Sequence, residues 1–378
     1  MTATVGPQPV SRPAPGASSD TARRYRGALI GLGKVARQSH LPALLGDAAV
    51  RERLELVAAV DPFHDLTAPD GLPLVCDRAA LPALGGGVPL DFVIVTTPTA
   101  THVEHVLWAL GEGYHVVCEK PVATTAADAA RIAAAARRAG RVVMPCHQYR
   151  FNPAWRQIRA WLDGGAIGRW HLAEFRVVRP AADRGSARDG TPWRGTRAAG
   201  GGGVLLDHGA HQKNQVLDAV GAPEAVRAWT GRLRHADYDV EDSAHVLFEY
   251  PGAAASLFLT WAGRARETHV RFVGETGAVD WTRGVLRIET DRGSETIDYA
   301  AALDKTAYAG WFAALFGEFA AAMDALARGD AHPREAHLDD VARVAALLEA
   351  SYAAARTACR VPLQGLPGAR RATRTAVP

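Results

Sequence analysis

The first 150 residues alternate short apolar runs with amphipathic stretches. The apolar runs are continuous, which suits parallel strands that are covered on both faces. The stretches between them have helical spacing, and the Ala-rich segment 123–140 has Gly140 as its expected stop. Strands that alternate with helices predict a parallel, doubly wound sheet. The predicted strands lie within GALIGLG (27–33), ELVAAVD (55–61), DFVIVTTPT (91–99), YHVVCEKP (114–121) and RVVMPCHQ (141–148).

The pattern changes after Tyr149. A helix that ends in glycines is expected in 152–168, followed by an alternating strand in 170–179. Between Ala225 and about Tyr299 several strands alternate apolar and polar residues, as in an antiparallel sheet with one solvated or interface face. The predicted strands are AVRAWTGRLR (225–234), DSAHVLFEY (242–250), AASLFLTWA (254–262), THVRFVG (268–274) and VLRIETD (285–291). Two amphipathic helices follow, in segments 311–329 and 338–358.

These patterns predict two domains between two tails. Residues 25–150 are expected to form an α/β Rossmann domain with a doubly wound parallel sheet. Residues 151–365 are expected to form an α+β domain with a large, mostly antiparallel open sheet, whose last helix packs back on the first domain. Segments 1–24 and 366–378 lack apolar periodicity, and we expect both to be disordered tails.

Composition narrows the class of protein. The net charge of +3 is small and much of the basic excess lies in the tails, which argues against a nucleic-acid partner. The four cysteines have no metal-type spacing, so we expect no metal site and reduced thiols in a cytoplasmic protein. No apolar run reaches the roughly 18 residues of a membrane helix. The N-terminal segment has no secretory pattern, and we expect neither a membrane nor a secretory route.

A glycine turn follows the first predicted strand. Gly31, Gly33 and Ala36 have the G-x-G-x-x-A spacing in which glycines let a pyrophosphate approach the backbone at a helix N-terminus. Asp61 ends the next strand, near the position of a ribose-binding acid. Its carboxylate suits the 2′-hydroxyl of NAD and repels the 2′-phosphate of NADP, so NAD is favoured. The alternative is an aspartate that only begins a turn before Pro62.

Glu119, Lys120 and Pro121 stand at the carboxyl end of another predicted parallel strand. Open α/β sheets bind their ligands at this edge. A lysine there can hold a substrate hydroxyl and lower its pKa, and Pro121 favours a rigid or cis turn that fixes the lysine's direction. An exposed loop lysine is the alternative.

The segment Gly200–Gly221 carries polar groups at helical spacing after four glycines. If the chain is helical from Leu205, then Asp207, His211 and Asn214 share one face. A carboxylate near an imidazole on a rigid helix can serve general acid–base catalysis. The alternative is a capping aspartate with a satisfied core histidine.

Several of these motifs, in this order, resemble the Gfo/Idh/MocA oxidoreductases. They are the glycine turn with its acid, TTPTATHVEHVLWALGEGYHVVCEKP, YRFNP (149–153), GGGVLLDHGAH and VEDSAHVLFEY (240–250). The resemblance covers roughly residues 26–363. It implies a homodimer or homotetramer formed through the open sheet, and NAD(P)-dependent oxidation or reduction of a carbinol in sugars or cyclitols. It also places the family's catalytic lysine on Lys120 and its Asp–His pair on Asp207 and His211.

The family often has a third acid where this chain has Asn214, so the resemblance does not carry substrate identity. We expect His211 to act as base, Lys120 to stabilise alkoxide character, and Asp207 to orient His211 or bond a neighbouring hydroxyl. The predicted cofactor contacts are Gly31, Gly33, Lys34, Val35, Ala36, Asp61, Thr97, Pro98, Thr99, His102, Glu119, Lys120 and Pro121. The predicted substrate contacts are Tyr149, Arg150, Trp193, Arg194, His208 and Asn214, with Lys213 as a further candidate. Tyr149 and Trp193 could instead pack between domains, and Arg150 could be a structural ion pair.

The favoured function is therefore an NAD-dependent dehydrogenase or reductase of a sugar, cyclitol or aminosugar. The Ala, Arg and Gly content suggests a GC-rich genome and specialised metabolism. One alternative is a redox-neutral epimerase or NAD-dependent glycosidase that retains its cofactor. Another is a non-catalytic sugar or dinucleotide sensor, because fold does not fix function.

Overall fold

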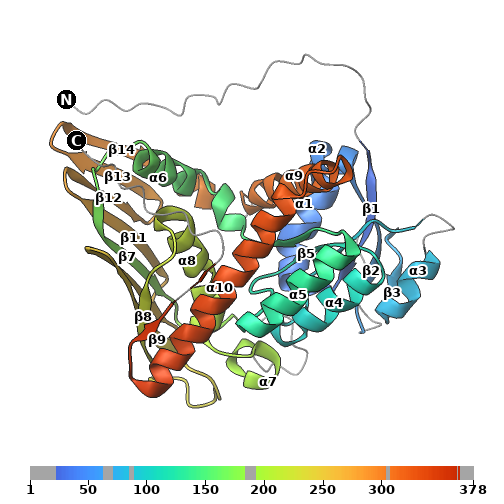
Figure 1. The fold of residues 1–378 in the computed structure, drawn as a ribbon, viewed down its shortest axis with the longest axis horizontal. Helices are drawn as coiled ribbons and strands as arrows, with labels where there is room; N and C mark the ends of the chain where they lie inside the picture. The colour runs from blue at the N-terminus through green and yellow to red at the C-terminus, as the bar shows by residue number, and fades with distance from the viewer. Residues whose placement is uncertain are drawn as a thin grey trace.

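The computed structural model describes residues 23–62, 71–84, 89–183, 193–303, 307–363 and 365–366. The predicted tails, 1–24 and 366–378, fall almost entirely outside these residues. Phe63, two positions after Asp61, also lies outside them. Figure 1 shows an α/β unit beside a broad second sheet, with the helix α10 running between them.

The first unit is a Rossmann sheet of six parallel strands. The strand order is β3-β2-β1-β4-β5-β6. The chain adds β2 and β3 on one side of β1 and then crosses over to add β4 to β6 on the other side, with β4 parallel to β1. A crossover of this kind opens a crevice at the carboxyl ends of the strands. The strands are β1 (Tyr25–Ile30), β2 (Leu54–Val60), β3 (Leu74–Val75), β4 (Phe92–Val95), β5 (His115–Cys118) and β6 (Val143–Pro145).

Helices cover both faces of this sheet. The π-helical stretch η1 (Ala36–His40) continues the turn after β1, and α5 (Ala126–Ala139) ends at Gly140, whose φ of 61° is left-handed. Gly140 is therefore the helix stop that the sequence predicted. The other helices of this unit are α1 (Leu41–Gly46), α2 (Ala48–Arg53), α3 (Leu81–Leu84) and α4 (His102–Gly111).

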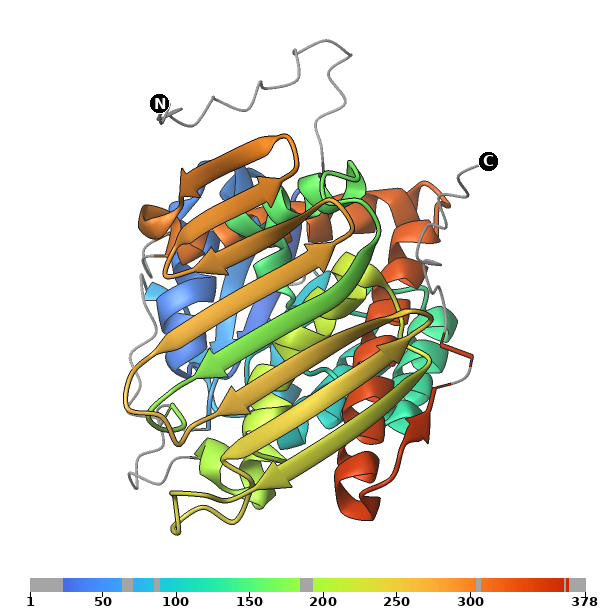
Figure 2. The same cartoon turned by 90° about the vertical axis from the view of Figure 1, so that its left-hand side faces the viewer.

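The second unit is a nine-stranded sheet in the order β14-β13-β12-β11-β7-β10-β9-β8-β15. Its strands pair antiparallel except β7 with β10, which are parallel. Helices lie behind one face, and Figure 2 shows the other face toward the viewer. The strands are β7 (Trp170–Val178), β8 (Ala225–Gly231), β9 (Ser243–Tyr250), β10 (Ala253–Thr260), β11 (Glu267–Gly274), β12 (Gly277–Thr282), β13 (Val285–Thr290), β14 (Gly293–Asp298) and β15 (Val361–Pro362).

The helices of the second unit separate its sheet from the first unit. η5 (Gln148–Phe151) and α6 (Pro153–Asp163) lead out of the Rossmann sheet, and α7 (Arg197–Gly200) precedes α8 (Val204–Val220). The apolar residues of α8, including Val204, Leu205 and Val216, pack in one core with Phe248 and Leu257 of the sheet.

The last two long helices contact both units. α9 (Tyr308–Ala327) inserts Phe312, Phe316 and Phe319 into the core of the Rossmann domain. α10 (His332–Thr357) places Leu338 in the Rossmann core, while its later turns join the core of the large sheet. Among the described helices, α9 alone is long and apolar enough to cross a membrane, but half of it is buried, as in a core helix of a globular protein.

The predicted fold class is confirmed, and four strands were missed. β3 and β15 have two residues each, too few to show periodicity. β12 and β14 begin with glycine, and β14 is mostly exposed, so neither presents a clear apolar face in the sequence. Whether such a segment forms a strand depends on the strands beside it, and the local sequence does not show those neighbours.

Candidate active site

A cavity of about 630 Å³ lies at the carboxyl ends of β1, β2 and β4. The turn after β1 forms one wall, and Gly31 has a φ of 98° there. A Cβ at Gly31 would come within 3.0 Å of the backbone of Thr96 and Thr97, so a side chain would collide with the neighbouring strand. The turn therefore requires glycine, and it leaves the room that a dinucleotide needs.

Asp61 lines this cavity at the end of β2. Its Oδ2 accepts a hydrogen bond of 2.8 Å from the backbone nitrogen of Leu32, within the glycine turn. The carboxylate is thus fixed against the turn that would hold the pyrophosphate. This position suits the predicted contact with a ribose hydroxyl.

The structure divides the predicted cofactor contacts into two groups. Those that line the cavity are Gly31, Gly33, Lys34, Val35, Asp61, Thr97 and Pro98. Those that do not line it are Ala36, Thr99, His102, Glu119, Lys120 and Pro121. Trp193 and Arg194, predicted as substrate contacts, also line it.

The far wall of the cavity has polar residues that the sequence analysis did not identify. Arg78 follows β3, lies over the Trp108 ring at 5.1 Å, and donates to Glu104 at 2.6 Å and to His105. Burial, and then Arg78, lower the pKa of His105 to about 4. Arg78 follows the carboxyl end of the parallel strand β3, as Asp61 follows β2. Recognising β3 in the sequence would have pointed to Arg78.

Lys120 and Asp207 meet across the two units. The Lys120 ammonium donates to the Asp207 carboxylate and to its backbone oxygen, both at 2.8 Å. Arg194 Nε lies 3.5 Å from the same carboxylate, which connects this pair to the cofactor cavity. Burial opposes ionisation of Asp207, but Lys120 and Arg194 hold the pKa of its carboxyl well below the usual range. Asp207 is therefore a permanent anion beside a cationic lysine.

His211 lies one turn beyond Asp207 on α8, and its ring meets the Tyr149 ring edge to face at 4.6 Å. Burial, and then the charge of Lys120, lower the pKa of His211 well below its ordinary value. The imidazole is neutral at physiological pH, the state that a general base requires. The carboxylate of Asp207 bonds Lys120 and not His211, so it orients the lysine.

Two predicted substrate contacts, His208 and Arg194, lie close to the Asp207 carboxylate. His208 Nδ1 is 3.4 Å from the Asp207 carboxylate and accepts a bond of 3.3 Å from Trp261 Nε1. Burial lowers the pKa of His208, although Asp207 opposes that shift. Arg194 is stacked over the Trp193 ring at 4.1 Å, so these two residues form one unit of the cavity wall.

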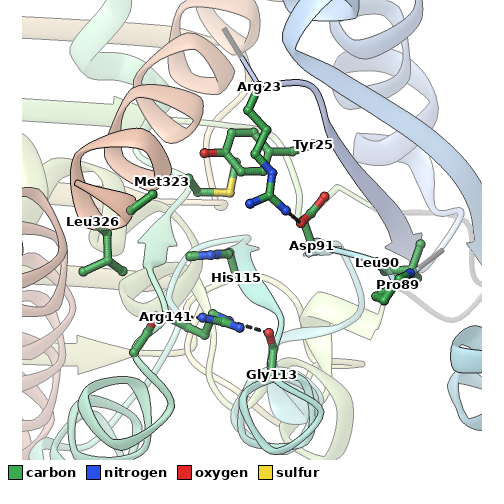
Figure 3. A pocket seen from close by; sticks show the side chains of 12 residues that line it. Arg23, Tyr25, Pro89, Leu90, Asp91, Gly113, His115, Arg141, Met323 and Leu326 are labelled. Carbon is green, nitrogen blue, oxygen red and sulfur yellow. Dashed lines mark hydrogen bonds and ion pairs between the residues drawn. The ribbon is translucent and has the colours of Figure 1, made fainter. Parts of the chain in front are cut away.

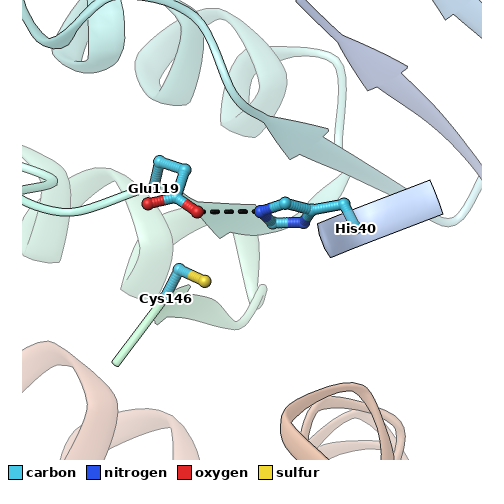
Figure 4. A group of neighbouring side chains, drawn as sticks. All are labelled: His40, Glu119 and Cys146. Carbon is cyan, nitrogen blue, oxygen red and sulfur yellow. Dashed lines mark hydrogen bonds and ion pairs between the residues drawn. The ribbon is translucent and has the colours of Figure 1, made fainter. Parts of the chain in front are cut away.

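Buried hydrogen bonds fix the strand end that carries Lys120. Glu119 Oε1 accepts from His40 Nε2 at 2.8 Å, with the Cys146 thiol beside them (Figure 4). Burial opposes ionisation of Glu119, but the bond from His40 lowers its pKa overall. His102 bridges the carbonyl oxygens of Thr97 and Pro121 at 2.9 and 2.8 Å. The Lys120–Pro121 peptide bond is cis, as the sequence suggested.

Arg150 and Asn214, two predicted substrate contacts, are bonded to each other, and Arg150 is also bonded to α10. Arg150 Nη1 bonds Asp340 of α10 at 2.5 Å, and its Nε donates to Asn214 Oδ1 at 3.2 Å. Asn214 is only 2% exposed. Arg150 therefore forms a structural ion pair, the alternative to a substrate contact that the sequence allowed. Lys213, the further candidate, is fully buried on α8.

A second cavity, of about 350 Å³, lies at the opposite edge of the Rossmann sheet. Figure 3 shows Arg23 paired with Asp91, and Arg141 bonded to the carbonyl oxygen of Gly113. No residue that we assign to catalysis or cofactor binding lines this cavity.

Comparison with known proteins matches both units. Residues 25–147 match the family described as "Oxidoreductase family, NAD-binding Rossmann fold", and residues 155–280 match the "GFO/IDH/MocA C-terminal domain". The chain is 30% identical over 304 residues to D-glucoside 3-dehydrogenase of Escherichia coli (strain K12), covering 74% of this chain and 82% of that protein. It is 30% identical over 298 residues to D-apiose dehydrogenase of Paraburkholderia graminis, covering 77% and 73%.

A solved structure shows the same fold. The inositol dehydrogenase homologue from Azotobacter vinelandii, complexed with NAD+, has a TM-score of 0.75 and 21% identity, covering 92% of this chain and 99% of that one. The chain belongs to the Gfo/Idh/MocA family of oxidoreductases. It is an NAD-binding dehydrogenase or reductase, as the sequence motifs predicted.

Proposed function

We propose that this enzyme moves a hydride between NAD and a carbinol or ketone carbon of a sugar or cyclitol. The observation that carries the proposal is the cationic Lys120, fixed by Asp207, next to the neutral base His211. The names of the two relatives, a D-glucoside 3-dehydrogenase and a D-apiose dehydrogenase, support a sugar as substrate.

Each side chain has one task in the oxidation. His211 takes the proton of the reacting hydroxyl. Lys120 donates a hydrogen bond to the same oxygen and stabilises its developing negative charge. Asp207 holds the lysine in place through two of its oxygens. The glycine turn and Asp61 would hold NAD, which when bound supplies the hydride acceptor. Ketone reduction uses the same groups in reverse.

The test is an absorbance screen for NADH with D-glucosides, D-apiose, inositols and aminocyclitols. We expect NADH to form with at least one compound, and faster with NAD than with NADP. NADH formation with none of them would contradict the proposal. A retained cofactor, with conversion of a glycoside or an epimer without added NAD, would instead identify the redox-neutral alternative. Tight sugar binding without turnover would identify a sensor.

We also propose a cytoplasmic homodimer or homotetramer that acts in specialised metabolism. The uncovered face of the nine-stranded sheet, with exposed Trp229 and Phe258, supports assembly through that face. The Ala, Arg and Gly content of the chain supports the metabolic setting. Light scattering after size exclusion tests the assembly, and a monomer at micromolar concentration would contradict it.

A further inference from the structure

Several buried polar atoms between η5, α8 and α10 have no protein partner. Within the described chain, both ring nitrogens of His147, Nδ2 of Asn214 and Nε2 of His337 make no hydrogen bond. The three residues are at most 5% exposed. Buried polar groups in native proteins nearly always bond to protein or to ordered water. This region is polar enough to hold such water.

These atoms belong to a row of polar side chains that begins at His211. Asn214 lies three residues after His211 on α8, and its Oδ1 accepts from Arg150 Nε at 3.2 Å. Arg150 Nη1 bonds Asp340 Oδ2 at 2.5 Å. His337 lies three residues before Asp340 on α10, on the same face.

The row ends at solvent. His337 Nε2 lies 3.9 Å from Glu318 Oε1 of α9, whose side chain is 48% exposed. The His147 ring lies near the row, since the charges of Arg150 and Asp340 both act on its pKa. We call His147, Arg150, Asn214, Asp340, His337 and Glu318 the relay row.

The two histidines of the row are neutral. Burial, and then Arg150, lower the pKa of His147 to about 3, against weaker effects of Asp340 and Glu119. Burial also lowers the pKa of His337 to about 4, with Asp340 opposing and Arg150 adding to the shift. A neutral imidazole can accept a proton at one nitrogen while it releases another from the second nitrogen. Neither ring needs to hold a charge for longer than the transfer.

Charged groups surround the row on every side. Arg150 and Asp340 form a fixed ion pair, with Asp218 near Arg150 and Arg343 near Asp340. Burial raises the pKa of Glu318, which makes it a better proton acceptor at the surface. The row thus has an ion pair in its middle and a weakly acidic carboxyl at its outer end.

The proposed oxidation releases one proton in each turnover. The C–H electron pair leaves with the hydride to the nicotinamide, the O–H bond breaks, and the hydroxyl proton goes to His211. His211 must lose that proton before the next cycle. It has no hydrogen-bonded partner among the described residues, and the Tyr149 ring lies against it. His211 is only partly buried, so the proton can leave through the substrate opening or, when substrate and cofactor fill that opening, through the interior.

We propose that water in the relay row carries this proton from His211 past His147 and His337 to solvent at Glu318. This inference rests on the proposed oxidoreductase function. His147 and His337 pass the proton, while Arg150, Asn214 and Asp340 are positioning residues that hold the water. In ketone reduction the same path supplies the proton.

The first test does not depend on activity. A high-resolution crystal structure of the full chain should show ordered water within hydrogen-bonding distance of His147 and His337. A dry row, with both His147 nitrogens packed against carbon, would overturn the proposal even if the enzyme oxidises sugars.

The second test uses the compound of the substrate panel that gives NADH fastest. His147→Gln keeps hydrogen bonding but cannot pass a proton. It should lower kcat about tenfold, less than the hundredfold scale of losing an acid–base group itself. The KM should not change, the solvent deuterium isotope effect should rise, and added imidazole buffer should restore part of the rate.

The control is His115→Gln, a partly buried histidine at the opposite edge of the sheet whose pKa is also lowered, and it should keep wild-type kinetics. His337→Gln repeats the test if His147→Gln does not fold. Wild-type kcat and an unchanged isotope effect in a folded relay variant would overturn the proposal. If no compound of the substrate panel gave NADH, the proposed function would be contradicted. The ordered water in the crystal structure would then be the test of the relay row.

Discussion

Lys120 is the residue on which the proposed chemistry depends most directly. Its side chain is 10% exposed, and its ammonium bonds two oxygens of Asp207. We expect Lys120→Met to lower kcat at least a hundredfold, the scale of a lost acid–base or electrostatic group. NAD affinity, measured by fluorescence quenching, should change little. A variant that loses NAD binding in parallel with kcat would show that Lys120 holds the cofactor instead.

His211 sets the expected pH dependence. Its lowered pKa means that the neutral base persists as the pH falls through 6.5, the ordinary histidine value. The kcat/KM of oxidation should therefore show no loss from His211 between pH 8 and 6.5, and should decline only below that range. The pH profile of wild type and of His208→Gln checks this. An acid limb at or above pH 6.5 in both proteins would contradict a base with a lowered pKa.

Asp61 should set the choice of cofactor. Asp61→Asn keeps an oxygen that can accept from Leu32, but it removes the charge that repels a 2′-phosphate. We expect the KM for NAD to rise and the preference for NAD over NADP to shrink. Steady-state kinetics with both cofactors measure the change. An unchanged ratio would mean that Asp61 only supports the turn.

At the residue scale, the sequence supplied candidate site residues but did not indicate which of them are in contact. The spacing of Asp207 and His211 suggested that they pair. The carboxylate instead bonds Lys120, 87 positions away in the chain. Likewise, nothing in the sequence pairs Arg150 with Asp340, 190 positions away. Contacts of this kind depend on how α8 and α10 are docked, and a local pattern does not contain that information.

At the scale of elements, the Arg150–Asp340 pair connects η5 to α10. Both side chains are largely buried, at 26% and 9% exposure. Removing one partner of a buried pair leaves an uncompensated charge, so Asp340→Ala should cost about 3–5 kcal/mol of unfolding free energy. Urea denaturation followed by circular dichroism measures it. The double variant Arg150→Met/Asp340→Leu should be less damaged, and equal losses would argue against charge as the cause.

Elements were predicted well where one face is plainly buried. The helix 123–140 shows a clear apolar face and a glycine stop, and α5 agrees with both. The parallel pairing of β7 with β10 had no such signal, because an alternating strand does not specify the direction of its neighbour.

At the scale of the whole molecule, buried histidines should make stability depend on pH. The pKa values of His147 and His337, about 3 and 4, lie below the 6.5 of an unfolded chain. Below pH 6.5 the unfolded state therefore binds protons that the folded state does not. Each histidine should then lower the free energy of unfolding by up to about 1.4 kcal/mol for each unit by which the pH falls below 6.5.

Urea midpoints at pH 7.5, 6 and 5 test this expectation. The midpoint should fall on the acid side of pH 6.5, and His147→Gln should reduce the slope. Equal midpoints at pH 7.5 and 5 would contradict it.

The insertion of α9 into the Rossmann core has a consequence for engineering. A cofactor module cut from the chain at residues 25–150 would lack Phe312, Phe316 and Phe319, which complete its interior. Such a fragment would expose an apolar groove to water and would be prone to aggregate. A chimera that exchanges cofactor modules between relatives therefore has to transfer two separate stretches of sequence, the first 150 residues and the α9–α10 pair.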